Sequence, residues 1–160
     1  MEIRSELRTE LDNFTSSRNA LIDILTREFR SGTSARALSN SFAPAFSRDQ
    51  VVQYLGAVAL HDSARSALKR AGLGAAADTR VTGIDAPREA ILNIAVDPAE
   101  TPDYADLPGQ IRAALRDSHL TLALTRDFPT EEDTQITDDF IDAVLLDGEP
   151  VRIVKAKPAT

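Results

Sequence analysis

The chain has no cysteine, and among its 160 residues there are only two histidines and two tyrosines. The absence of cysteine excludes disulfide bonds, thiolate metal ligands and a thiol nucleophile. Tyr54 and Tyr104 are too few and too scattered to form a platform on which unpaired bases stack. No apolar run approaches the roughly 18 residues of a membrane span, and the charged residues 1–11 lack the apolar core of a signal peptide. We therefore expect a cytoplasmic protein without a membrane segment.

The composition is that of a globular protein, with 42% hydrophobic and 27% charged residues, but the net charge of −7 is unevenly divided. Residues 1–73 contain ten Lys or Arg and eight Asp or Glu, a net of +2. Residues 74–160 contain eight Lys or Arg and seventeen Asp or Glu, a net of −9. DNA affinity depends on neutralising phosphates, so the whole-chain charge argues against nucleic acid, whereas this asymmetry indicates one part that faces nucleic acid and one acidic part, or chance variation between domains. A net of +2 is small, so binding would depend on specific contacts or on two copies of the chain.

The clearest pattern in this half lies in residues 32–55, where a short helix, an apolar turn and a second helix are predicted. Ser47 and Gln50 have the Ser-x-x-Gln spacing of a capping box, in which each side chain bonds the other residue's backbone amide. Phe46, just before the cap, and Val51 have the spacing of a hydrophobic staple. These signals predict that the second helix begins immediately after Ser47.

The second helix is predicted to have two different faces. Its inward positions are apolar, namely Val51, Leu55 and Val58. Its outward positions are Arg48, Asp49, Gln50, Val52 and Gln53. Arginine pairs with guanine and glutamine with adenine through two hydrogen bonds, and recognition helices use their first turns for such contacts. The outward face is therefore chemically suited to read base edges.

Residues 33–55 resemble the helix-turn-helix superfamily of bacterial DNA-binding transcriptional regulators, with Ala37 and Leu38 as the packed pair of the first helix. The turn at residues 42–45 is two or three residues longer than usual and lacks the family's small residue. The resemblance implies a dimeric regulator that binds double-stranded DNA sequence-specifically. We expect base contacts from Arg48, Gln50 and Gln53, and phosphate contacts from Ser47, Thr33, Ser34 and Arg36.

Residues 2–31 are predicted to form one long helix or two stacked helices, ending at Gly32. Apolar residues recur at alternating steps of four and three, and Arg18 is the one polar residue in the series. The apolar members are Leu7, Leu11, Phe14, Leu21 and Leu25. Such a stripe can pair with a second copy as a coiled coil, or it can cover a three-helix core. A homodimer would suit palindromic DNA half-sites.

A further helix is predicted from His61 to Leu73, ended by Gly72 and Gly74, with a hinge at residues 74–78. Residues 1–73 are therefore expected to form a helical DNA-binding domain with a long N-terminal helix. Residues 79–157 are expected to form a separate acidic domain. In the DNA-binding interpretation the acidic domain supplies dimerisation, a pocket for a small-molecule effector, or a surface for a protein partner.

In the second half of the chain, the spacing of apolar residues changes from the helical period to the alternation that is typical of strands. Strands are predicted at residues 90–96, 120–124 and 151–155, with a helix at 105–118 between the first two. Residues 136–145 favour another helix, although residues 143–154 also fit a hairpin. The order predicts a small C-terminal α/β domain (β-α-β-α-β) with a partly parallel sheet. The whole chain is then α+β, with an N-terminal all-helical helix-turn-helix domain.

Catalytic and metal-binding groups are sparse. Acidic residues gather at positions 131–142, but they lack the spacing and central glycine of a calcium loop, and negative charge is favourable before a helix. His61 and His119 are expected at helix ends, and neither has a recognisable nucleophile near it in a known motif. We predict no enzyme activity, no catalytic residue, no metal site and no cofactor.

Two alternative functions remain open beside DNA binding. The weaker is a small enzyme whose site residues no motif connects, and the stronger is an interaction module. The chain would then be a protein-interaction or assembly module that does not bind DNA. The N-terminal stripe would pair with a partner helix, and the acidic half would keep the complex soluble or dock a basic partner.

Overall fold

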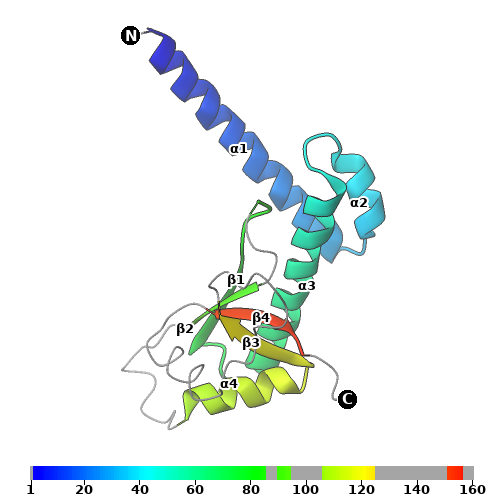
Figure 1. The fold of residues 1–160 in the computed structure, drawn as a ribbon, viewed down its shortest axis with the longest axis vertical. Coiled ribbons are helices and arrows are strands. Elements are labelled where there is room, and N and C mark those ends of the chain that lie inside the picture. Colours follow the sequence, from blue (N-terminus) through cyan, green and yellow to red (C-terminus); the bar gives the residue numbers. More distant parts are fainter. Residues whose placement is uncertain (1, 86–89, 95–105, 125–150, 157–160) are drawn as a thin grey trace. The chain divides into compact units, whose positions relative to one another are not determined.

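The computed structural model describes residues 2–85, 90–94, 106–124 and 151–156 (Figure 1). Its elements in chain order are α1 (Glu2–Arg30), α2 (Ala35–Phe42), α3 (Arg48–Arg70), β1 (Ala77–Val81), β2 (Ala90–Ile94), α4 (Leu107–Arg116), β3 (Leu120–Leu124) and β4 (Val151–Lys155). The mixed α+β class agrees with the prediction. The chain forms two compact units, residues 1–55 and 56–160. Their boundary lies inside α3, whereas the sequence placed it at residues 74–78.

α1 is one continuous helix of 29 residues, which decides between the two predicted alternatives. It ends where the sequence places the stop, because Gly32 adopts a φ of 107° that favours glycine. The amide of Gly32 donates to the carbonyl of Phe29, and the amide of Thr33 donates to the carbonyl of Glu28, both at 3.1 Å. These two bonds form a Schellman motif, which satisfies carbonyls at the helix end.

The core of unit 1 contains the apolar positions that the helical period selected. Leu38 of α2, Phe46 of the turn, and Val51 and Leu55 of α3 are all buried, and Leu25 of α1 is fully buried. The inward face predicted for the second helix is therefore correct. Because Val51 and Leu55 are buried, the side of α3 that contains Arg48, Asp49 and Val52 is exposed.

α3 continues to Arg70, so the predicted break before His61 is wrong. His61 does not start a helix. It lies in the middle of α3 with its ring buried, and both ring nitrogens have partners. The helix ends in a second Schellman motif at Gly72, whose φ is 77°, with the amide of Leu73 donating to the carbonyl of Leu68 at 2.9 Å. The predicted stop at Gly72 is confirmed.

The four described strands of unit 2 form one antiparallel sheet in the order β1-β2-β4-β3. The predicted partly parallel pairing is wrong. β2 and β3 run in the same direction, but β4 lies between them and pairs antiparallel with both. β1 was missed, because its first two residues fall within the predicted hinge at 74–78 and the strand includes no long apolar run. In β1, buried Ala77 and Thr79 alternate with exposed Asp78 and Arg80.

The hydrophobic core of unit 2 joins the second half of α3, α4 and the sheet. It includes Ala64 and Leu68 from α3, Ile111 and Leu115 from α4, and strand residues such as Ile153. Pro108 lies in the first turn of α4 as predicted, and Asp106 caps that helix by accepting from the amide of Gly109 at 3.3 Å. The helix or hairpin expected at residues 136–145, and the acidic residues at 131–142, lie outside the described residues.

Candidate nucleic-acid interface

The predicted DNA-binding residues all belong to unit 1, on α2, α3 and the segments that precede them. α2 ends at Phe42 and α3 begins at Arg48, so five residues separate the helices, including a cis peptide bond between Ala43 and Pro44. The usual helix-turn-helix connection has about three or four residues. The turn is therefore longer than usual, but by one or two residues where the sequence suggested two or three, and Phe46 is its buried residue.

The start of α3 is fixed by the predicted capping box. The amide of Ser47 donates to Oε1 of Gln50 at 2.9 Å, and the amide of Gln50 donates to Oγ of Ser47 at 3.1 Å. The cap uses a lone pair of the Ser47 oxygen, so the hydroxyl proton can still be donated to a phosphate. It also turns the Gln50 carbonyl oxygen back to the helix start. The cap therefore occupies the side-chain oxygen that the predicted contact between Gln50 and adenine would need.

The outward face of the first turns of α3 consists of Arg48, Asp49 and Val52, which are exposed, with half-buried Gln53 beside them. Val52 is 45% exposed. The sequence placed Val52 on this face without assigning it a role, although an apolar side chain here can contact the methyl group of thymine. Asp49 offers an acceptor that suits the amino group of cytosine. The helical period already placed Asp49 and Val52 on this face, so it could have added both residues to the candidate base-reading site.

The residues before α2 differ in how well they suit a phosphate. Ser34 is exposed and caps α2 by accepting from the amide of Ala37 at 3.2 Å, and Arg36 in the first turn is also exposed. The hydroxyl of Thr33 instead donates to Oε2 of Glu28, at 3.5 Å. Because that carboxylate repels phosphate, Thr33 is the least suitable of the predicted phosphate ligands.

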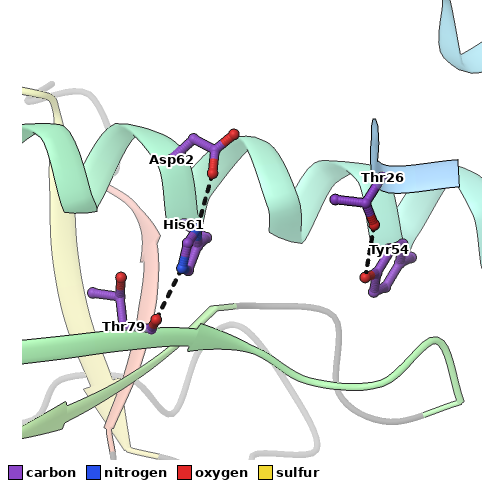
Figure 2. A network of polar contacts seen from close by, with 5 residues as sticks. All are labelled: Thr26, Tyr54, His61, Asp62 and Thr79. Carbon is purple, nitrogen blue, oxygen red and sulfur yellow. Dashed lines mark hydrogen bonds and ion pairs between the residues drawn. The ribbon is translucent and has the colours of Figure 1, made fainter. Parts of the chain in front are cut away.

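Two contacts attach α1 to the elements that carry this face. The guanidinium of Arg18 lies over the ring of Phe46, 5.6 Å from its centroid. Thr26 Oγ1 lies 3.1 Å from the hydroxyl of Tyr54 on α3 (Figure 2). Since Thr26 already donates to the carbonyl of Ile22, the Tyr54 hydroxyl is the donor of this bond. α1 therefore supports both the turn and α3 within unit 1.

The charge of unit 1 is balanced. Residues 1–55 contain seven Arg and seven Asp or Glu, a net of zero. The +2 of residues 1–73 comes from residues 56–73, where Arg65, Lys69 and Arg70 outnumber Asp62. If unit 1 binds DNA, the affinity has to come from placed side chains and helix starts, because unit 1 has no excess of positive charge.

Unit 2 contains a separate polar network around His61 (Figure 2). Nε2 of His61 lies 2.9 Å from the carbonyl oxygen of Thr79 on β1, and Nδ1 lies 2.9 Å from Oδ1 of Asp62. A carbonyl only accepts, so Nε2 carries the proton of that bond. This network attaches α3 to β1. The other histidine, His119, lies in the turn after α4 with a φ of 56°.

In the part of the chain that the structure describes, no group of three or more His, Asp or Glu residues is arranged to hold a metal ion. No helix among the described residues is long and apolar enough to cross a membrane. Comparison with protein-family models, curated proteins and solved structures finds no match to this chain. A function for this chain can therefore be proposed only from its own residues and their geometry.

Proposed function

We propose that residues 33–55 bind double-stranded DNA in a sequence-specific manner, as a bacterial transcriptional regulator with two copies of the chain on one site. The observation that carries this proposal is the first turn of α3. It is held by a reciprocal cap and a buried staple, while Arg48 and its outward neighbours remain exposed. A rigid helix start with exposed polar side chains is what reading base edges requires.

Each residue then has a distinct role. Arg48 donates two hydrogen bonds to guanine, and Gln53 contacts a neighbouring base edge. Ser47, Ser34 and Arg36 hold phosphates, since hydroxyls and arginines near helix starts position a protein on the duplex without reading sequence. Gln50 serves mainly as the cap. Thr33 is kept from a phosphate by Glu28.

Two copies are needed for affinity as well as for symmetry. One unit 1 has no net charge and few cationic side chains near α3, so a single copy neutralises few phosphates. Two copies double these contacts and match a site with two-fold symmetry. In this proposal the acidic residues 79–157 provide a dimer contact, an effector pocket or a surface for a protein partner.

The test is selection of bound fragments from bacterial genomic DNA by the purified full chain, repeated at two salt concentrations. We expect a short site repeated with two-fold symmetry, bound more weakly at higher salt. Arg48→Ala should weaken binding by about 1–3 kcal/mol and relax the preference at one base pair. Arg65→Ala is the matched control, because it removes the same charge from an exposed position on the same helix. It should leave the base preference unchanged.

Absence of enrichment at low salt would overturn this proposal. The second candidate function, an assembly module that does not bind DNA, would then be favoured. Its specific support is the exposed apolar side chains of α1, among them Ile3, which is 79% exposed, and Phe14, which is 66% exposed. Capture of DNA that is equally affected by Arg48→Ala and Arg65→Ala would also contradict sequence reading by α3.

A further inference from the structure

The sheet of unit 2 has two edges, and they differ in how their outward backbone groups are bonded. β1 and β3 are the edge strands, because the strand order is β1-β2-β4-β3 (Figure 1). Along an antiparallel strand, alternate residues direct both their N–H and C=O groups to the neighbouring strand, and the residues between them direct both groups away from it. An edge strand whose outward groups have no partner is a template for a further strand.

The outward groups of β1 are bonded to α3 and to the turn that follows it. The amide of Ala77 donates to the carbonyl of Leu73 at 3.1 Å. The carbonyl of Thr79 accepts from Nε2 of His61 at 2.9 Å. Ala77 and Thr79 are alternate residues of the strand, so both direct their backbone groups away from β2. A further strand could pair along this edge only by breaking both bonds.

The outward groups of β3 are not bonded in this way. The ladder between β3 and β4 begins with the amide of Ala156, which donates to the carbonyl of His119 at 2.9 Å. By alternation, Thr121 and Ala123 then bond β4 as well. Three residues direct their backbone groups to the open edge: Leu120, Leu122 and Leu124. No hydrogen bond to these outward groups is present within the described part of the chain.

β3 also lacks the features that protect the edges of natural sheets. Residues 120–124 contain no charged residue and no proline. The side chains of Leu120 and Leu122 belong to the core of unit 2, and Thr121 between them is exposed. The core therefore holds the strand in place, so pairing along its edge requires little ordering of the backbone.

We propose that β3 pairs antiparallel with β3 of a second copy of the chain, so that the two four-stranded sheets join into one sheet of eight strands. A two-fold axis beside Leu122 sets the N–H and C=O groups of this residue against those of the same residue in the second copy. Leu120 of each copy then lies opposite Leu124 of the other. In this register every outward group of both strands is bonded, and no charged side chain faces another.

The difference between the two edges selects this occupant. When two copies pair through β3, the joined sheet ends on β1 at both sides, where the outward groups are already bonded to Leu73 and His61. Association therefore stops at two copies, because a longer assembly needs a second open edge on each copy. A strand from another protein would satisfy β3 but would bring an unpaired edge of its own. The inference stands on unit 2 alone and does not depend on DNA binding.

The test is sedimentation velocity of the full chain without DNA, over a concentration range that spans about 1–500 µM. We expect a monomer–dimer equilibrium. Thr121→Lys should raise the dissociation constant on the order of 10-fold, since it sets two like charges at diagonal positions across the axis. Ser63→Lys adds the same charge at an exposed position of α3 and should leave the constant unchanged. A monomer throughout, assembly beyond two copies, or a dimer that Thr121→Lys does not weaken would overturn the proposal.

A backbone substitution tests the edge without changing a side chain. Incorporation of the α-hydroxy analogue of leucine at position 122 replaces the outward N–H of Leu122 with an ester oxygen. The dimer then loses two N–H···O bonds, so its dissociation constant should rise about 10–100-fold. A dimer of unchanged affinity would show that this edge is not the interface.

Crosslinking tests which edges meet. The chain has no cysteine, so Thr121→Cys provides a single thiol. In the proposed dimer the two thiols lie at diagonal positions with backbones about 7–8 Å apart, within reach of a short bis-maleimide. Arg80→Cys on β1 is the control, because the joined sheet places its two thiols on opposite outer edges, roughly 30 Å apart. We expect a crosslinked dimer from Thr121→Cys alone. Crosslinking through Arg80→Cys, or a dimer that Thr121→Cys does not crosslink, would contradict the proposal.

Discussion

The guanidinium of Arg18 lies over the ring of Phe46, with 5.6 Å between the guanidinium carbon and the ring centroid. Arg18 is the polar member of the apolar stripe on α1, and Phe46 is the buried residue just before the α3 cap. The contact therefore joins α1 to the segment that sets where α3 begins. It explains how an arginine is accommodated in an otherwise apolar row.

A double-mutant cycle of Arg18→Ala and Phe46→Leu measures this contact. Each single change should lower the free energy of unfolding, and the coupling between them should be about 0.5–1 kcal/mol. Urea unfolding provides the measurement, and Arg27→Ala serves as an exposed control on the same helix. Additive effects of Arg18→Ala and Phe46→Leu would show that the two groups do not interact.

Gln50 is predicted to act as a cap more than as a reader of bases. Gln50→Glu retains an oxygen that accepts from the Ser47 amide, and its negative charge is favourable at a helix start, so the free energy of unfolding should not fall. Gln50→Ala should lower it by about 1 kcal/mol. In DNA selection the added charge of Gln50→Glu should weaken binding at all sites equally. A lost preference for adenine at one position would assign Gln50 to base contact instead.

His61 is predicted to be important for the stability of unit 2. His61→Ala leaves the Thr79 carbonyl without its donor and opens a cavity beside β1, so we expect a loss of about 2–4 kcal/mol in the free energy of unfolding. Asp62 is 42% exposed, and Asp62→Asn places an amide group beside Nδ1 that can donate to it, so its cost should stay below about 1 kcal/mol. Equal losses for the two variants would contradict a role for the Thr79 bond.

The Thr79 hydroxyl is predicted to lower the stability of unit 2. Its Oγ1 is buried and has no hydrogen-bond partner among the described residues. Thr79→Val replaces this group with a methyl of similar shape on a β-strand, so the free energy of unfolding should rise by about 1 kcal/mol. Thr121→Val on β3 is the control, because Thr121 is exposed and its change should stay within about 0.5 kcal/mol. A loss of stability in Thr79→Val would indicate that the hydroxyl has a partner.

Local features of this chain were predictable because their bonds join residues close in sequence. The capping box at Ser47 and Gln50 and the glycine stops at Gly32 and Gly72 each involve residues no more than five positions apart. The inward face of α3 follows from the helical period alone. The residues offered for base and phosphate contact were likewise found by period and chemistry, and their contact with DNA stays a prediction.

The features that the sequence did not reveal depend on distant partners. β1 is a five-residue strand of mixed polarity, and it is a strand because it pairs with β2, with Ala77 opposite Ile94 and Val81 opposite Ala90. The sheet is antiparallel because β4 lies between β2 and β3, an arrangement that no local pattern encodes. The predicted break in α3 was wrong for the same reason, because Nε2 of His61 bonds the carbonyl oxygen of Thr79, which is 18 residues away in the sequence.

The sequence by itself determined the stops at Gly32 and Gly72, the start of α3 after Ser47, the face that α3 buries, and how charge divides along the chain, because these properties arise from bonds and periods within a few turns. Only the tertiary structure decided that α3 is one helix, that Arg18 meets Phe46, and that the strands pair in the order β1-β2-β4-β3. Those outcomes depend on which distant group satisfies a buried polar atom or an unpaired strand edge. That choice is made by packing across the whole unit.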